Sequence, residues 1–182
     1  MSERQSLLED YQGRDYPKVS RSGLSYSQTS GFCHQEIARY VTLYKGLDQH
    51  DQTARLIRDM IDMLLRRYHG YCIQENLGAH YREQDLVPDI KTDFEHVIPA
   101  KVARDCVLTD RMSVSDALNI PTCKLSKVKH QKLKQLGLAY KTPDIFWFWR
   151  RYQDLDIQVE TRDGTKINMN DWNLDDHYRN FA

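Results

Sequence analysis

The side chains best suited to chemistry in this sequence lie in residues 93–99, which read Asp-Phe-Glu-His-Val-Ile-Pro. Hydrolysis of a phosphodiester needs a base that activates water and a cation that neutralises the charge growing on the phosphate. Glu95 is the natural ligand for Mg²⁺, because this cation favours carboxylate and water oxygens. His96 is the natural base, because a neutral imidazole is available near pH 7. The adjacent pair therefore predicts a site for metal-dependent hydrolysis.

The elements around this pair decide whether the two side chains can act together. Residues 92–98 are expected to form a strand, and neighbouring side chains of a regular strand point to opposite faces. A bend before Pro99 is therefore required to bring Glu95 and His96 toward one phosphate. Pro99 ends the strand and suits the first position of a helix, which is expected at residues 100–108.

Three further elements are predicted downstream. Ser113 and Asp116 are placed as in a capping box, at the start of a short helix at residues 114–118. Residues 119–123 are expected to be extended. A basic helix is expected at residues 126–136. Gly137, which follows it, can end the helix.

Three short sequences, in this order, resemble a known enzyme family. They are EHVIP at residues 95–99, NIPTC at residues 119–123, and the basic helix with His130. Over residues 93–136, about a quarter of the chain, the sequence resembles the HNH or ββα-metal (His-Me finger) endonucleases. The resemblance implies an α+β fold in which two strands and a helix hold one Mg²⁺ or another divalent cation. It also implies an enzyme that hydrolyses the phosphodiester bonds of DNA.

The resemblance also implies roles for individual residues. The acidic–His pair of the family falls on Glu95, a metal ligand, and on His96, the general base. Its middle Asn, which orients the base, falls on Asn119. Its last His or Asn, a metal ligand on the helix, falls on His130. Because the spacing from Asn119 to His130 is longer than in the family, Ser126 is the other candidate for this position.

Two features depart from the family pattern. The stretch between His96 and Asn119 is long enough for an inserted helix. The cysteine pairs that often brace such motifs with structural zinc are missing, because the four cysteines form no C-x-x-C pair. We expect reduced cysteines and an intracellular, cytoplasmic protein. The polar residues 1–10 and the absence of a long apolar run predict neither a signal peptide nor a membrane span.

The charge of the chain is unevenly distributed, although the formal net charge is zero. Residues 101–150 contain ten basic and four acidic residues, a net charge of +6, and residues 121–142 contain no acidic residue. Such a basic block predicts a surface that binds anions. The lysines expected to contact DNA phosphates are Lys124, Lys127, Lys129 and Lys134.

Other functions are compatible with the same residues. A non-catalytic DNA-binding protein would use the lysine-rich helix at residues 126–136 and keep Glu95 and His96 as a structural pair. An RNA-directed toxin nuclease is a third interpretation. Asp89-Ile90-Lys91 resembles the carboxylate-x-lysine half of the PD-(D/E)xK nucleases, without a clear acidic partner upstream. For an endonuclease, restriction, homing and phage-type cleavage are all compatible with the sequence.

The sequence divides into four predicted regions. Residues 1–31 are an N-terminal arm, residues 32–87 a helical platform, residues 88–140 the ββα-metal nuclease core, and residues 141–182 a C-terminal aromatic segment and β-hairpin. The predicted fold class is therefore α+β, with a helical N-terminal part.

The spacing of apolar residues gives further predictions for the helical platform and for the C-terminal region. A short helix is expected at residues 33–44, and apolar residues at three-to-four spacing predict a second helix at residues 53–68, ended by Gly70. The aromatic residues 146–149 are expected in the core rather than stacked on nucleic-acid bases. An Asp-Gly pair between two alternating runs predicts a hairpin over residues 157–169.

Overall fold

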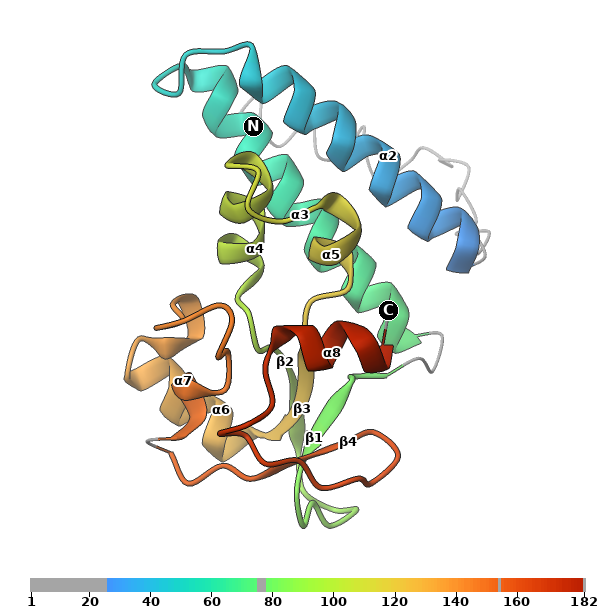
Figure 1. Ribbon diagram of the computed structural model, residues 1–182, viewed down its shortest axis with the longest axis vertical. Coiled ribbons are helices and arrows are strands. Elements are labelled where there is room, and N and C mark those ends of the chain that lie inside the picture. The colour runs from blue at the N-terminus through green and yellow to red at the C-terminus, as the bar shows by residue number, and fades with distance from the viewer. Residues whose placement is uncertain (1–25, 75–77, 154, 182) are drawn as a thin grey trace, which may run out of the picture.

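A small sheet and two long helices form the two parts of this mixed α+β fold (Figure 1). The structure is a computed structural model that describes residues 26–74, 78–153 and 155–181. The predicted N-terminal arm therefore lies outside the described residues up to residue 25. None of the helices in the described ranges is long and apolar enough to cross a membrane. All four cysteines are free thiols.

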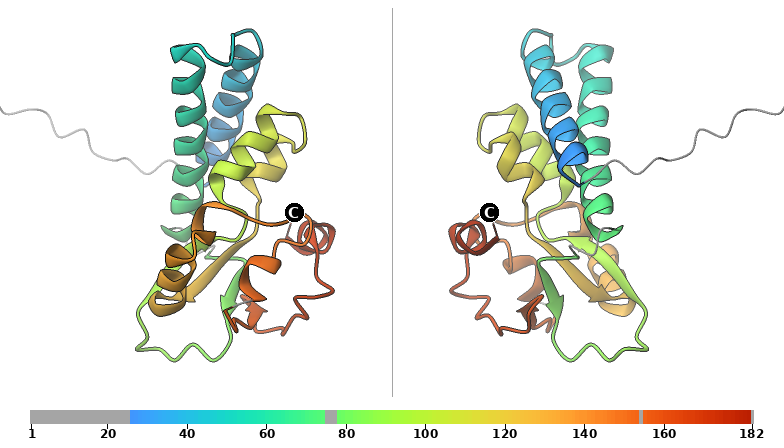
Figure 2. Two further views of the ribbon diagram at one scale, coloured as in Figure 1. Left: turned by 90° about the vertical axis from the view of Figure 1, so that its left-hand side faces the viewer. Right: turned by 90° about the vertical axis from the view of Figure 1, so that its right-hand side faces the viewer.

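The long helices α2 (Tyr26–Lys45) and α3 (Gln52–Gln74) pack side by side and project away from the sheet (Figure 2). Apolar side chains at helical spacing join them, including the fully buried Ile37, Ile61 and Leu65. The predicted end of the second helix at Gly70 is wrong, because α3 continues for another turn. Cys72, in this last turn, packs against the hydrophobic core, and such packing can outweigh the poor helix propensity of glycine.

The sheet contains four strands in the order β2-β3-β1-β4. The strands are β1 (Tyr81–Glu83), β2 (Thr92–His96), β3 (Thr122–Ser126) and β4 (Val159–Thr161). β3 pairs antiparallel with β2 and parallel with β1, and β1 pairs antiparallel with β4. β2 is therefore an edge strand, which leaves its outer side free of other strands.

Helix α6 (Lys127–Gln135) begins at the residue after β3, so that β2, β3 and α6 follow one another as strand, strand and helix. The insertion between the two strands, which the sequence predicted, contains α4 (Ala100–Leu108) and α5 (Val114–Leu118). The capping box of α5 is confirmed, since the Ser113 side chain accepts from the Asp116 N–H and the Asp116 carboxylate accepts from the Ser113 N–H.

The C-terminal region differs from the predicted hairpin. β4 pairs with β1, and its expected partner, the run after the Asp-Gly turn, forms only the single bridge between Glu160 and Lys166. Of the aromatic residues 146–149 that were expected in the core, Phe148 and Trp149 are fully buried, whereas Phe146 is exposed and Trp147 is half-buried. The short helices η1 (Leu138–Tyr140), α7 (Arg150–Gln153) and α8 (Leu174–Phe181) complete the region.

A buried histidine attaches α8 to the sheet. The Tyr81 hydroxyl receives a hydrogen bond from Trp172 Nε1 (2.8 Å) and donates to His177 Nδ1 (3.0 Å). His177 Nε2 donates to the Asn119 carbonyl (2.7 Å). Burial, followed by the nearby His80, lowers the pKa of His177 to about 3, and burial lowers the pKa of His80 to about 4. Both rings are therefore neutral in the folded protein.

These buried histidines predict that the fold loses stability in mild acid. In the unfolded chain, His80 and His177 would take up protons with an ordinary pKa of about 6.5. Above this pH the two rings are neutral in both states, and the fold has its full stability. As pH falls toward 4, only the unfolded chain binds protons, so the folded state loses stability. Between pH 7 and pH 5 we expect the free energy of unfolding to fall by up to about 2 kcal/mol for each ring. Urea denaturation at the two pH values measures this. His177→Gln should show a smaller fall than the wild type, and an equal fall in both proteins would contradict the assignment.

Candidate functional site

Two carboxylates and a histidine meet where α6 packs against β2. Residues two apart on a strand share a face, so Asp93 and Glu95 both point toward α6. His130, which is nine-tenths buried on α6, lies between them. Its Nδ1 is 2.8 Å from Asp93 Oδ2, and its Nε2 is 2.9 Å from Glu95 Oε2. The structure therefore brings the two predicted metal ligands, Glu95 and His130, into direct contact.

The charges of these three groups are coupled. The hydrogen bond to Glu95 raises the pKa of His130 against the opposing effect of burial, and Asp93 raises it further. The hydrogen bond from His130 lowers the pKa of the Asp93 carboxyl group. His130 thus links the two carboxylates through its two ring nitrogens. Asp93 was not predicted as a site residue, although its spacing from Glu95 on an expected strand indicates a shared face.

A buried arginine fixes the other side of Glu95. Arg151, on α7, is 1% exposed, and its Nη2 donates to Glu95 Oε1 at 2.8 Å. Its Nη1 donates to the carbonyls of His96 (2.8 Å) and Val97 (2.7 Å), and Nη2 also donates to the Leu138 carbonyl. Arg151 therefore holds the Glu95 carboxylate so that Oε2 faces His130. No local pattern in the sequence indicated this residue.

His96 points to the opposite face of β2 from Glu95. The strand keeps its regular pairing with β3 through His96, and the chain bends only at Val97 and Ile98, beyond the pair, so Glu95 and His96 stay on opposite faces. The His96 ring meets α3, where its Nε2 is 3.0 Å from His69 Nδ1. Burial, followed by the positive charges of Arg66 and Arg151, lowers the pKa of His96 to about 4.

A cavity at the edge of the sheet nevertheless joins the two faces. It has a volume of about 220 Å³, and both Glu95 and His96 line it. Side chains from both faces of β2 can line one cavity because no further strand covers this edge. His130 also lines the cavity, together with the cations Arg66 and Lys134 and with Tyr140. The cavity thus combines a carboxylate, two imidazoles and cationic groups.

The other predicted residues lie elsewhere. Asn119 is the C-terminal cap of α5 and donates through Nδ2 to the Phe181 carbonyl (3.1 Å). It lines a separate cavity of about 180 Å³ and does not line the cavity of Glu95. Ser126, the alternative to His130, donates its backbone N–H to Glu83 Oε2 (2.7 Å) and does not line the Glu95 cavity either.

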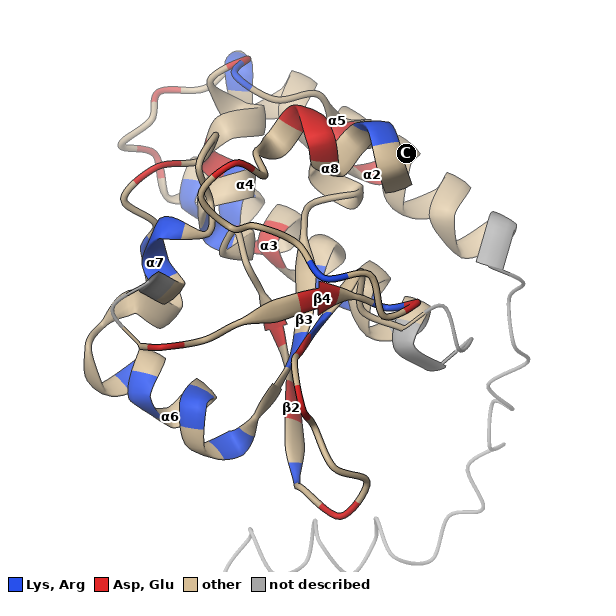
Figure 3. Ribbon diagram, turned by 60° about the horizontal axis from the view of Figure 1, so that its bottom comes forward, with Lys and Arg blue, Asp and Glu red and all other residues tan. Residues whose placement is uncertain are grey.

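The predicted DNA-contacting lysines have different surroundings, although several bands of positive charge lie along α6 (Figure 3). Lys127 lies 3.8 Å from Asp93, and Lys129 is paired with Glu83 at 3.2 Å. Lys124 is exposed on β3, and Lys134 is the one of the four that lines the cavity. The free positive charge near the site is therefore smaller than the sequence count indicates.

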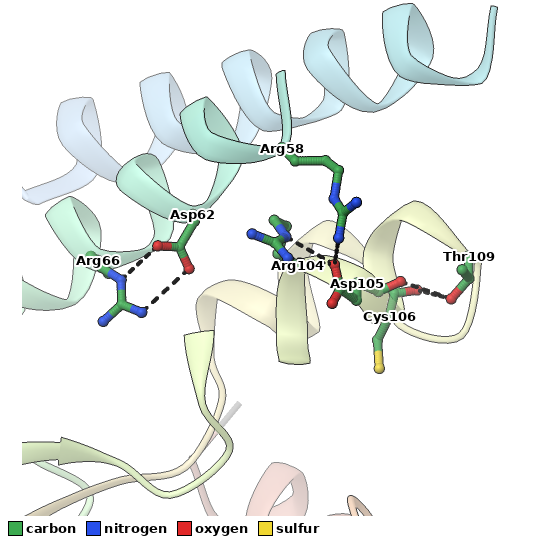
Figure 4. Close-up of polar contacts among 7 residues, drawn as sticks. All are labelled: Arg58, Asp62, Arg66, Arg104, Asp105, Cys106 and Thr109. Carbon is green, nitrogen blue, oxygen red and sulfur yellow. Dashed lines mark hydrogen bonds and ion pairs between the residues drawn. The ribbon is translucent and has the colours of Figure 1, made fainter. Parts of the chain in front are cut away.

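Arg66 adds a cation from α3 that the sequence analysis did not single out. Its Nε donates to Asp62 Oδ2 at 2.7 Å, one helical turn earlier, and its side chain is about half exposed (Figure 4). Figure 4 also shows a separate cluster in which Arg58 on α3 and Arg104 on α4 share the Asp105 carboxylate. Asp62 orients Arg66 at the cavity, and the Asp105 cluster joins α3 to α4.

Comparison of the chain with protein-family models, with curated proteins and with solved structures gave no match. Within residues 26–74, 78–153 and 155–181, no three His, Cys, Asp or Glu side chains are grouped as a metal site.

Removal of Arg151 should destabilise the fold strongly. In Arg151→Met, the Glu95 carboxylate, 5% exposed, would lose its buried guanidinium partner. Breaking a buried pair in this way costs about 3–5 kcal/mol. Urea denaturation of Arg151→Met measures the loss, with Arg150→Met at the neighbouring, exposed position as the matched control. Equal stability of the two variants would show that Arg151 does not support Glu95.

Proposed function

We propose that the protein is a metal-dependent endonuclease of the HNH (ββα-metal) type that hydrolyses DNA. One observation carries the proposal: Glu95 on β2 and His130 on α6, which follows β3, are in contact beside a cavity that His96 also lines. The resemblance in sequence assigned these three residues to one site. The contacts between residues 35 positions apart support that assignment independently of the resemblance.

The donor atoms at the cavity fit a divalent cation. Asp93 accepts a hydrogen bond from His130 Nδ1, which leaves Nε2 as the nitrogen directed toward Glu95 Oε2. A carboxylate that orients a metal-binding histidine in this way is a common feature of metal sites. A carboxylate oxygen together with an imidazole nitrogen suits Mg²⁺, Mn²⁺ or Zn²⁺, and two protein ligands leave positions for water and phosphate oxygens. When bound, the cation would neutralise charge that develops on the phosphate.

The remaining residues of the cavity supply the other parts of a hydrolysis. His96 would accept a proton from water as the water oxygen forms a bond to phosphorus and the bond to the leaving oxygen breaks. Arg66 and Lys134 would bind non-bridging or neighbouring phosphate oxygens. Because the cavity opens at the edge of the sheet, a DNA backbone could reach it without displacing another strand.

The cleavage reaction tests the proposal directly. Wild-type protein with Mg²⁺, Mn²⁺ or Zn²⁺ should nick supercoiled plasmid, and His96→Ala should do so at least about 100-fold more slowly, because general-base catalysis contributes about 10²- to 10⁴-fold. His50→Ala, at an exposed position on the loop after α2, is the matched control. Equal nicking by wild type and His96→Ala would refute the assignment. DNA binding without cleavage by any cation would favour the non-catalytic alternative, and cleavage of RNA alone would change the substrate.

Metal affinity provides a second test that needs no DNA. Calorimetric titration with Mn²⁺ should show one site in the wild type and none of comparable affinity in Glu95→Gln or His130→Ala. Asp93→Asn should bind about 10- to 100-fold more weakly, because the residue that orients a metal-binding histidine contributes by this amount. Unchanged affinity in all three variants would place the cation elsewhere.

A further inference from the structure

A chain of three hydrogen-bonding groups leads away from the proposed base. His96 on β2 contacts His69 on α3, with Nε2 of His96 and Nδ1 of His69 3.0 Å apart. His69 Nε2 in turn lies 2.9 Å from the carbonyl oxygen of Leu118, the last residue of α5. Three elements that are distant in the sequence thus meet at these two imidazole rings.

The direction of the hydrogen bonds follows from the chemistry of the end of the chain. A carbonyl oxygen can only accept, so His69 Nε2 must carry a hydrogen. Burial lowers the pKa of His69 well below its ordinary value, so this ring is neutral and its Nδ1 holds a lone pair. The nitrogen of His96 that faces it must then be the donor. Neutral His96 is thereby fixed as the Nε2–H tautomer, and its lone pair is on Nδ1.

Packing also restricts the orientation of both rings. His69 is 2% exposed and meets His96 edge to face, with ring centroids 4.8 Å apart. Tyr68 contacts the other side of His69 at 5.4 Å, and Phe94 contacts His96 at 5.2 Å. Within the described residues, His96 Nδ1 has no hydrogen-bond partner. Since His96 lines the cavity of Glu95 and His130, Nδ1 is the nitrogen left to accept a proton there.

We propose that His69 is the positioning residue of the active site, which holds His96 in the tautomer and orientation that a general base requires. This inference rests on the endonuclease function proposed above. It gives His69 the role that the sequence resemblance assigned to Asn119, whose side chain is bonded to Phe181 and lies outside the cavity. The helical part of the protein then contributes directly to the site.

Two variants of equal size separate positioning from packing. Asn at position 69 can place its side-chain oxygen near the position of His69 Nδ1 and accept from His96, whereas Leu has the same shape and no acceptor. We expect His69→Leu to lower kcat for plasmid nicking by about 10- to 100-fold, the usual effect of removing such a supporting hydrogen bond. KM and the Mn²⁺ affinity should stay within about twofold of the wild type. His69→Asn should recover most of kcat.

Nitrogen-15 NMR of the imidazole rings provides a readout that does not depend on activity. The two-bond and three-bond couplings show which ring nitrogen carries the hydrogen. Wild type and His69→Asn should show His96 as the Nε2–H tautomer at pH 7, and His69→Leu should show a mixture of tautomers. Urea denaturation of each variant establishes that it is folded under the assay conditions.

The outcomes distinguish this inference from the proposed function. An Nδ1–H tautomer for His96 in the wild type, or equal kcat in wild type and His69→Leu, would overturn the role of His69 even where DNA is cleaved. Equal kcat loss in His69→Leu and His69→Asn, with the tautomer unchanged, would also overturn it. The expected tautomers in a protein that cleaves no DNA would support the hydrogen-bond arrangement and overturn the positioning role of His69 in catalysis together with the endonuclease proposal.

Discussion

The buried contact between Arg151 and Glu95 is the interaction on which the rest of the site depends. A carboxylate in the interior is stable only when its charge is compensated, and Arg151 supplies this compensation from α7. The same guanidinium binds the carbonyls of His96 and Val97, where β2 ends. The aromatic segment before Arg151 packs Phe148 and Trp149 in the core and so fixes the position of α7. The C-terminal region is therefore needed for the geometry of a site whose other residues lie far earlier in the chain.

Strand geometry imposes a second constraint, and the fold meets it differently from the prediction. Neighbouring residues on a strand point to opposite faces, so a bend was expected to bring Glu95 and His96 together. The strand stays regular, and its position at the edge of the sheet lets one cavity reach both faces. Each side chain then needs its own support: His130 and Arg151 hold Glu95 on one face, and His69 holds His96 on the other.

The parts of the fold that the sequence predicted are those with strong local signals. Pro99 marks the start of α4, and the capping box of Ser113 marks the start of α5, because these signals act within a few residues. β1 has three residues and exists only through its pairing with β3 and β4, so no local pattern indicated it. The predicted hairpin is reduced to the single bridge between Glu160 and Lys166 on the outer side of β4, whose inner side pairs with β1. In the site, Glu95 and His130 were found through spacing within one motif, whereas His69 and Arg151 reach it from 27 and 55 positions away from His96.

Helix α5 shows how local and distant interactions combine at the site. A helix of five residues is too short to be stable alone, and the carbonyls of its last turn have no partner within it. At the start of α5, the capping box supplies hydrogen-bond partners for free backbone N–H groups. At its end, two buried imidazoles donate to consecutive backbone carbonyls: His69 to Leu118 and His177 to Asn119. Because imidazole N–H groups are favourable near the negative end of a helix, α5 is stabilised at both ends. The insertion between the two strands therefore also supplies the fixed acceptor that orients His69, and through it His96, at the cavity.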